Sequence, residues 1–138
     1  MIQIIAGRKG SGKTKRLIAQ TNEAASARHG SILFIDDGKD YLYDVVHQVR
    51  FVDASEYHIT DPDMFYGFVC GLAAQDYDLE AIYVDAFLRI VGAKMDELED
   101  FFANLSKVLN QHNINMVLSV SADPESLPDF AKPMIQEA

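Results

Sequence analysis

Five short, mainly apolar runs recur along the chain, separated by longer segments in which polar and apolar residues mix. They lie at residues 2–6, 31–35, 49–52, 81–84 and 114–120. Apolar runs of this length, without strict alternation, are typical of strands covered on both faces, as in parallel sheets. The pattern therefore predicts five buried strands.

The segments between these runs place apolar residues three and four positions apart, which is helical spacing. Arg28, His29 and Gly30 resemble a helix C-terminus, because cations and then a glycine follow the last apolar positions. Asp61 before Pro62 is a typical helix start. The spacing predicts helices over residues 13–28, 62–72, 87–91 and 95–111, and a short helix over 40–47.

Strands that alternate with helices indicate an α/β protein, because parallel strands need crossover connections that pack on the sheet. No repeat, linker or low-complexity segment divides the sequence. We expect one domain over residues 1–138, a three-layer sandwich of about five mostly parallel strands with helices on both faces.

The segment after the first apolar run carries the strongest chemical signal. Residues 7–14 read GRKGSGKT, which fits the pattern G-x-x-x-x-G-K-T between a predicted strand and a predicted helix. Glycines let the backbone turn tightly and approach a ligand, because they lack Cβ. Backbone N–H groups and the start of the following helix then form an anion site. We therefore predict a binding site for a polyphosphate.

This segment resembles the Walker A motif of the P-loop NTPases. The resemblance implies that Lys13 reaches the β- and γ-phosphates and that the Thr14 hydroxyl binds Mg²⁺. It implies ATP and Mg²⁺ as cofactors, with adenine preferred by default because no N-K-x-D motif for guanine occurs. The implied nucleotide-binding residues are Gly7, Arg8, Lys9, Gly10, Ser11, Gly12, Lys13, Thr14 and Lys15.

The strand predicted at residues 81–84 runs directly into Asp85, and residues 82–85 resemble a Walker B motif. The resemblance implies that Asp85 binds Mg²⁺ and acts with Lys13 as a catalytic residue. In most additional-strand ATPases, the branch that includes RecA-like and AAA+ proteins, a glutamate follows this aspartate. Here Ala86 follows. Fast hydrolysis by this chain alone is not expected unless Glu97 or Glu99 approaches from the next helix.

The last predicted strand, residues 114–120, distinguishes two branches of the P-loop NTPases. In the additional-strand branch it lies between the strands at 2–6 and 81–84, whereas in the kinase–GTPase branch those two strands are neighbours. The additional-strand branch also places a polar sensor residue at the end of this strand, where it bonds the γ-phosphate or its water. The resemblance implies Ser119 or Ser121 as this sensor.

The chain is acidic overall, with a formal net charge of −9, yet Arg8, Lys9, Lys13, Lys15 and Arg16 gather around residues 7–14. A local positive field suits a nucleotide, whereas the acidic remainder argues against general nucleic-acid binding. No apolar run approaches the roughly 18–20 residues of a membrane span. A strand at the N-terminus leaves no room for a signal peptide, so we expect a cytoplasmic protein.

These features predict an Mg-ATP-binding protein with weak or partner-stimulated ATPase activity. A protein partner or second copy would contact residues 86–94, where Arg89 is a candidate for reaching a neighbour's phosphate. One alternative is a small-molecule kinase, because Asp36 and Asp37 end a strand where α/β sheets bind ligands, although they also suit a solvated turn. The lack of any arginine after Arg89 counts against the lid of such kinases. Another alternative is a non-catalytic nucleotide sensor, favoured by Ala86.

Overall fold

The computed structural model describes residues 1–27 and 29–137, and its centre is a five-stranded parallel sheet. The strands are β1 (Ile2–Gly7), β2 (Ser31–Asp36), β3 (Arg50–Asp53), β4 (Leu79–Val84) and β5 (Asn115–Ser121). All five predicted strands are therefore present. Because the strands are parallel, their carboxyl ends share one edge of the sheet, which is where ligands of open α/β sheets bind.

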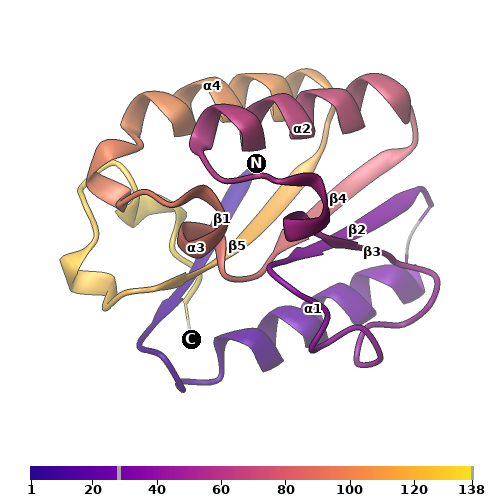
Figure 1. Cartoon of the computed structure of the whole chain (residues 1–138), viewed down its shortest axis with the longest axis horizontal. Coiled ribbons are helices and arrows are strands. Elements are labelled where there is room, and N and C mark those ends of the chain that lie inside the picture. Colours follow the sequence, from indigo (N-terminus) through magenta and orange to yellow (C-terminus); the bar gives the residue numbers. More distant parts are fainter. Residues whose placement is uncertain (28, 138) are drawn as a thin grey trace.

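Helices cover both faces of this sheet, which makes the predicted three layers (Figure 1). One face is covered by α1 (Lys13–Ala27), and the other by α2 (Pro62–Gln75), α3 (Phe87–Val91) and α4 (Glu99–Gln111). The larger apolar core lies under the second group, where the rings of Phe65, Phe87, Phe101 and Phe102 contact one another. Burying each such ring contributes roughly 1.5–3 kcal/mol.

The strand order is β1-β5-β4-β2-β3. The last strand thus lies between the strand that precedes residues 7–14 and the strand that precedes Asp85, as the additional-strand prediction requires. The two register sets agree, since Met116 pairs with both Ile2 and Ile82. An arrangement in which β1 and β4 are direct neighbours is excluded.

The prediction of a helix over residues 40–47 is wrong. The segment between β2 and β3 forms consecutive turns instead, with bonds such as Leu42 N to Lys39 O that span only three residues. The side-chain amide of Asn22 on α1 bonds backbone groups of this segment that a helix would use. It accepts from Val46 N and donates to Asp44 O, both at 3.0 Å. β2 and β3 are therefore joined by a loop that is bonded to α1.

The single helix predicted over residues 95–111 is also divided. A 3₁₀ turn at Met95–Glu97 comes first, and Leu98 leaves helical geometry at φ −111° and ψ 15° before α4 begins at Glu99. The side chain of Glu97 accepts the Lys94 backbone N–H, which closes the short turn on itself. At the other predicted boundary, α1 ends at Ala27, and Arg28 lies outside the described residues.

The C-terminal segment packs along the free edge of β1. Ile135 forms a parallel bridge with Ile4, and Gln136 N donates to Ile4 O at 2.7 Å. The Gln136 side chain also bonds Gln3 and Gln20, and Arg16 on α1 donates to both Gln136 and Glu137. This segment therefore joins β1 to α1.

Among residues 1–27 and 29–137, none of the helices combines the length and the apolar character needed to cross a membrane.

Candidate functional site

Residues 7–14 form a tight loop, called here the P-loop, between β1 and α1. Gly10 and Gly12 have positive φ angles of 83° and 90°, a conformation that a side chain with Cβ disfavours. Ser11 N donates to Arg8 O at 3.0 Å, and a Cβ on Gly7 would lie 2.5 Å from Ser11 Oγ. Glycine is thus favoured at positions 10 and 12 by the backbone conformation, whereas a side chain at position 7 would displace the Ser11 hydroxyl.

Lys13 is the first residue of α1, and its side chain turns back over the P-loop. Its Nζ donates to Arg8 O at 3.0 Å. The backbone of the helix begins at the same place, because Arg16 N donates to Gly12 O at 3.0 Å. An ammonium group and the positive end of a helix dipole therefore lie together at this loop.

Asp85 follows β4 directly and lies beside the start of α1. Thr14 Oγ1 approaches its two carboxylate oxygens at 3.0 and 3.2 Å. Asp85 is only 6% exposed, and Ser119 Oγ on β5 donates to Asp85 Oδ1 at 2.6 Å. A buried carboxylate without such partners would be costly, so these hydroxyls fix its position. Three separate elements thus meet at one carboxylate.

The two candidate sensor serines lie at different depths. Both point to the same side of β5, because residues two apart in a strand share a face, so alternation does not distinguish them. Ser119 is 2% exposed, bonds Asp85 and accepts the Ala86 N–H at 3.0 Å. Ser121 is exposed at the end of the strand. Of these two serines, Ser119 is the one that is hydrogen-bonded to Asp85.

Asp36 at the end of β2 is buried rather than part of a solvated turn, with 3% of its surface exposed. Burial is the main cause that raises the pKa of this carboxyl from 3.8 to about 6, and the nearby charge of Asp85 adds to the rise. The Asp37 backbone N–H, which donates to Asp36 Oδ1 at 2.7 Å, acts in the opposite direction. The next side chain, Asp37, accepts from Arg89 Nε at 2.7 Å.

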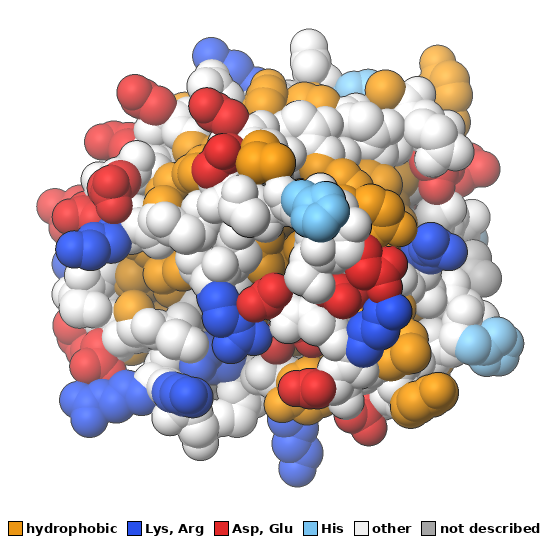
Figure 2. Space-filling model, viewed as in Figure 1, with side chains coloured by type: hydrophobic (Ala, Val, Ile, Leu, Met, Phe, Trp, Pro, Cys, Tyr) orange, Lys and Arg blue, Asp and Glu red, His pale blue; other side chains and the backbone are white. Residues whose placement is uncertain are grey.

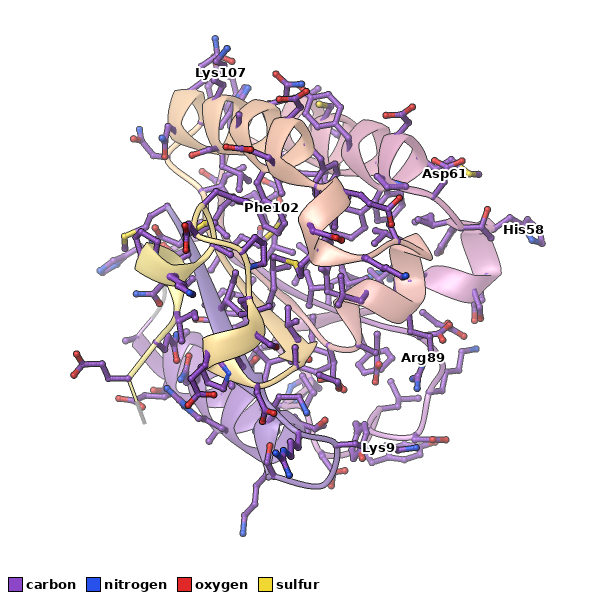
Figure 3. The ribbon with its side chains drawn as sticks, turned by 90° about the vertical axis from the view of Figure 1, so that its left-hand side faces the viewer. Lys9, His58, Asp61, Arg89, Phe102 and Lys107 are labelled. Carbon is purple, nitrogen blue, oxygen red and sulfur yellow. The ribbon has the colours of Figure 1, made fainter. Side chains whose placement is uncertain are left out.

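A cavity of about 1050 Å³ opens beside the P-loop and brings most of the predicted residues together. Lys9 on the P-loop and Arg89 on α3 lie on facing sides of it (Figure 3). In Figure 2 carboxylates gather where α4 begins, whereas basic and acidic side chains are mixed in the lower half of the face. The residues that line the cavity are Lys9, Gly10, Gly12, Lys13, Thr14, Lys15, Ile18, Asp40, Tyr41, Asp44, Asp85, Ala86, Phe87, Leu88, Arg89, Ser119 and Ser121.

Several predicted residues do not line this cavity. Arg8 points away from it, with an 81% exposed side chain that pairs with Asp123 at 2.8 Å. Glu97 and Glu99 are exposed and outside the lining, so neither approaches Asp85 from the next helix. The proposed partner segment 86–94 does reach the lining, through Ala86, Phe87, Leu88 and Arg89, whereas its residues Ile90 and Val91 lie in the core.

The far end of the cavity was not anticipated from sequence. Ile18 on the second turn of α1 faces Asp40, Tyr41 and Asp44 from the loop between β2 and β3. The sequence did not predict this loop, because Tyr41 and Leu42 fit a helical pattern and residues 40–47 were therefore predicted to form a helix. A signal that was present is the Asp-Gly pair at positions 37 and 38, which favours a turn and then a loop beside the ligand edge.

Comparisons with known proteins identify similar folds. No protein-family profile matches the sequence, and no curated protein is recognisably similar to it. The flagellar accessory protein FlaH from Methanocaldococcus jannaschii has a similar structure, with a TM-score of 0.62 and 14% identity over 93% of this chain and 63% of that chain. The pCW3 conjugation coupling protein TcpA, in monomer form with ATPγS, gives a TM-score of 0.48. Its sequence identity is 15%, over 96% of this chain and 46% of that chain.

This chain therefore spans less than two thirds of the length of FlaH. At 14% identity the likeness concerns the fold alone. The shared fold is a three-layer α/β sandwich with five parallel strands and helices on both faces of the sheet.

The raised pKa of Asp36 predicts how stability depends on pH. The native carboxyl holds its proton up to about pH 6, whereas the unfolded one loses it near 3.8. Stability therefore falls as pH rises across this interval, and the loss is complete above it. Asp36→Asn keeps the acceptor for Asp37 N and removes a penalty of at most about 3 kcal/mol at pH 8. Urea unfolding from pH 4 to pH 8, without nucleotide or Mg²⁺, measures this.

The matched control is Asp129→Asn, because the Asp129 side chain is fully exposed. Its effect on the free energy of unfolding is expected to stay near zero throughout. A stability difference between Asp36→Asn and the unaltered protein that does not change with pH would contradict the assignment.

Proposed function

We propose that this protein binds Mg-ATP at the P-loop and hydrolyses it slowly, or faster when a partner contributes. The observation that carries the proposal is the convergence of the Thr14 hydroxyl and the Asp85 carboxylate, 3.0 Å apart, at the foot of a glycine loop that carries Lys13. A carboxylate and a hydroxyl placed beside a phosphate-binding loop have the chemistry of a magnesium–nucleotide site.

Each part of the P-loop has a role in this proposal. Backbone N–H groups around Gly10 and Gly12, together with the start of α1, hold the phosphate oxygens. Lys13 exchanges its bond to Arg8 O for the β- and γ-phosphates. Lys9 and Lys15 line the same cavity and add positive charge. The acidic remainder of the protein leaves this loop as the place where a polyanion is attracted.

The residues present fit Mg²⁺ better than a metal held by protein side chains alone. The described residues contain no cluster of three His, Cys, Asp or Glu side chains that could hold a metal. Thr14 and Asp85 would therefore share the ion with phosphate oxygens and water, which is how Mg²⁺ is usually bound. Bound there, the ion would neutralise charge on the phosphates. Ser119 keeps one Asp85 oxygen in place at 2.6 Å.

Slow turnover is supported by the absence of a glutamate after Asp85. Ala86 occupies that position, and its left-handed backbone, at φ 54°, turns the chain straight into α3. Asp36 is only 3% exposed and does not line the cavity, so it is not placed to accept the proton of an attacking water.

The far end of the cavity suits the base of the nucleotide. Tyr41 offers an aromatic ring and Ile18 an apolar side chain, between which a purine can stack. Asp40 and Asp44 add acceptors for an amino group. The loop that carries them is bonded to Asn22 on α1, so the base end and the phosphate end share one helix.

A sensor function is the second candidate, and one contact favours it. Ser119 Oγ bonds Asp85 and also accepts the Ala86 N–H, which lies at the start of α3. A change in the position of Asp85 on nucleotide binding would therefore be transmitted to α3 and to its exposed residues. In this case the output is a change in partner binding, and turnover is unnecessary.

Replacing Lys13 with Ala is expected to reduce Mg-ATP affinity by at least about a hundredfold, because it removes the charge that pairs with two phosphates. Isothermal calorimetry measures the affinity, and circular dichroism checks the fold. Lys107→Ala on α4 is the matched control, since Lys107 does not line the cavity. Equal ATP affinity in folded Lys13→Ala and unaltered protein would refute the proposed function.

Replacing Asp85 with Asn is expected to weaken ATP binding in the presence of Mg²⁺ far more than in its absence. The amide keeps an acceptor for Ser119 but loses the charge that attracts the ion. Titrations with Mg²⁺ and with a chelator, on both proteins, separate the two conditions. The same loss of affinity in each would show that Asp85 does not act through the metal.

A further inference from the structure

Arg89 is the only cation lining the cavity that does not come from the P-loop or its helix, among the residues that the structure describes. Lys9, Lys13 and Lys15 lie on one wall, whereas Arg89 lies on α3, on the wall that follows Asp85. Figure 3 shows Arg89 on the side of the cavity that faces Lys9. The cavity is thus walled by positive charge on two sides.

The guanidinium of Arg89 is held at one end and free at the other. Its Nε donates to Asp37 Oδ2 at 2.7 Å, and Asp37 lies at the end of β2, beside the buried Asp36. The two terminal nitrogens make no hydrogen bond to another described residue, and the side chain is 66% exposed. Four N–H donors are therefore available in a fixed fork, which matches the geometry of a phosphate group.

We infer that Arg89 binds the terminal phosphate of a triphosphate held in its own chain, an inference that rests on the proposed function. A loop of this kind surrounds the phosphates nearer the base, and its lysine reaches the outer two. The terminal phosphate extends toward Thr14 and Asp85, and Arg89 lies on α3, the helix that begins shortly after Asp85. The fork makes paired, charge-assisted hydrogen bonds that a diphosphate cannot receive.

Asp37 is a positioning residue in this arrangement. It fixes Nε and so turns the terminal nitrogens toward the cavity. Because the pair is already neutral without a ligand, Arg89 is not drawn to other carboxylates nearby, such as Asp36 and Asp85. The same bond keeps Arg89 with the cavity of its own chain, so it acts there and not on the phosphate of a neighbouring copy.

The test is the ratio of the affinities for ATPγS and ADP, measured by calorimetry with Mg²⁺. Arg89→Ala is expected to lower ATPγS affinity by about tenfold or more and ADP affinity by less than about twofold. Arg89→Lys, which keeps the charge without the fork, is expected to give an intermediate ratio. Arg50→Ala is the matched control, because Arg50 is an exposed arginine on β3 outside the cavity lining.

Asp37→Asn tests the positioning role. It is expected to lower the same ratio, and the double variant Arg89→Ala, Asp37→Asn is expected to match Arg89→Ala alone, because Asp37 acts through Arg89. A merely structural role for Asp37 would instead lower the affinities for both nucleotides and add to the effect of Arg89→Ala.

Two results would overturn the inference while leaving the proposed function intact. One is an unchanged ratio in Arg89→Ala when both nucleotides still bind. The other is a preference for ATPγS that appears only as protein concentration rises, which would assign the arginine to a neighbouring copy. Unaltered protein that binds neither nucleotide would overturn both the inference and the proposed function.

Discussion

The burial of one carboxylate organises this structure. Asp85 ends a central strand with almost no exposed surface, and a charge in that position must be bonded to be tolerated. Its partners are hydroxyls from Thr14 on α1 and Ser119 on β5. The bonds therefore require that the P-loop helix begins at the point where two adjacent strands end. The β1-β5-β4 order makes this possible, because it places Ser119 between the P-loop strand and Asp85.

Much of the fold could be predicted because its elements have local causes. The apolar runs at residues 2–6 and 81–84 form strands because burial on both faces stabilises them. Asp61, which precedes Pro62, starts α2 because its side chain accepts the Met64 N–H. The P-loop could be predicted from its glycine pattern because its shape also has a local cause. Positive φ at Gly10 and Gly12 is a local property of the chain.

The failures come from contacts between distant residues. Residues 40–47 have the apolar spacing of a helix, but the Asn22 amide takes the backbone groups that a helix would use. The burial of Asp36 was equally unpredictable, because it depends on the position of β2 between β4 and β3 in the sheet. The ion pair of Arg89 with Asp37 shows the same limit, because it joins α3 to the end of β2 and no local pattern indicated it.

The C-terminal segment has a consequence for how the sheet can be extended. A parallel sheet has two edges at which a foreign strand can add. Here Ile135 and Gln136 already occupy the β1 edge, so addition there must first break bonds that also hold Arg16 and Gln20 on α1. The opposite edge is β3, which is only four residues long. The protein is therefore protected against edge-to-edge aggregation on the side that carries the P-loop, and the same residues that provide this protection hold the P-loop helix.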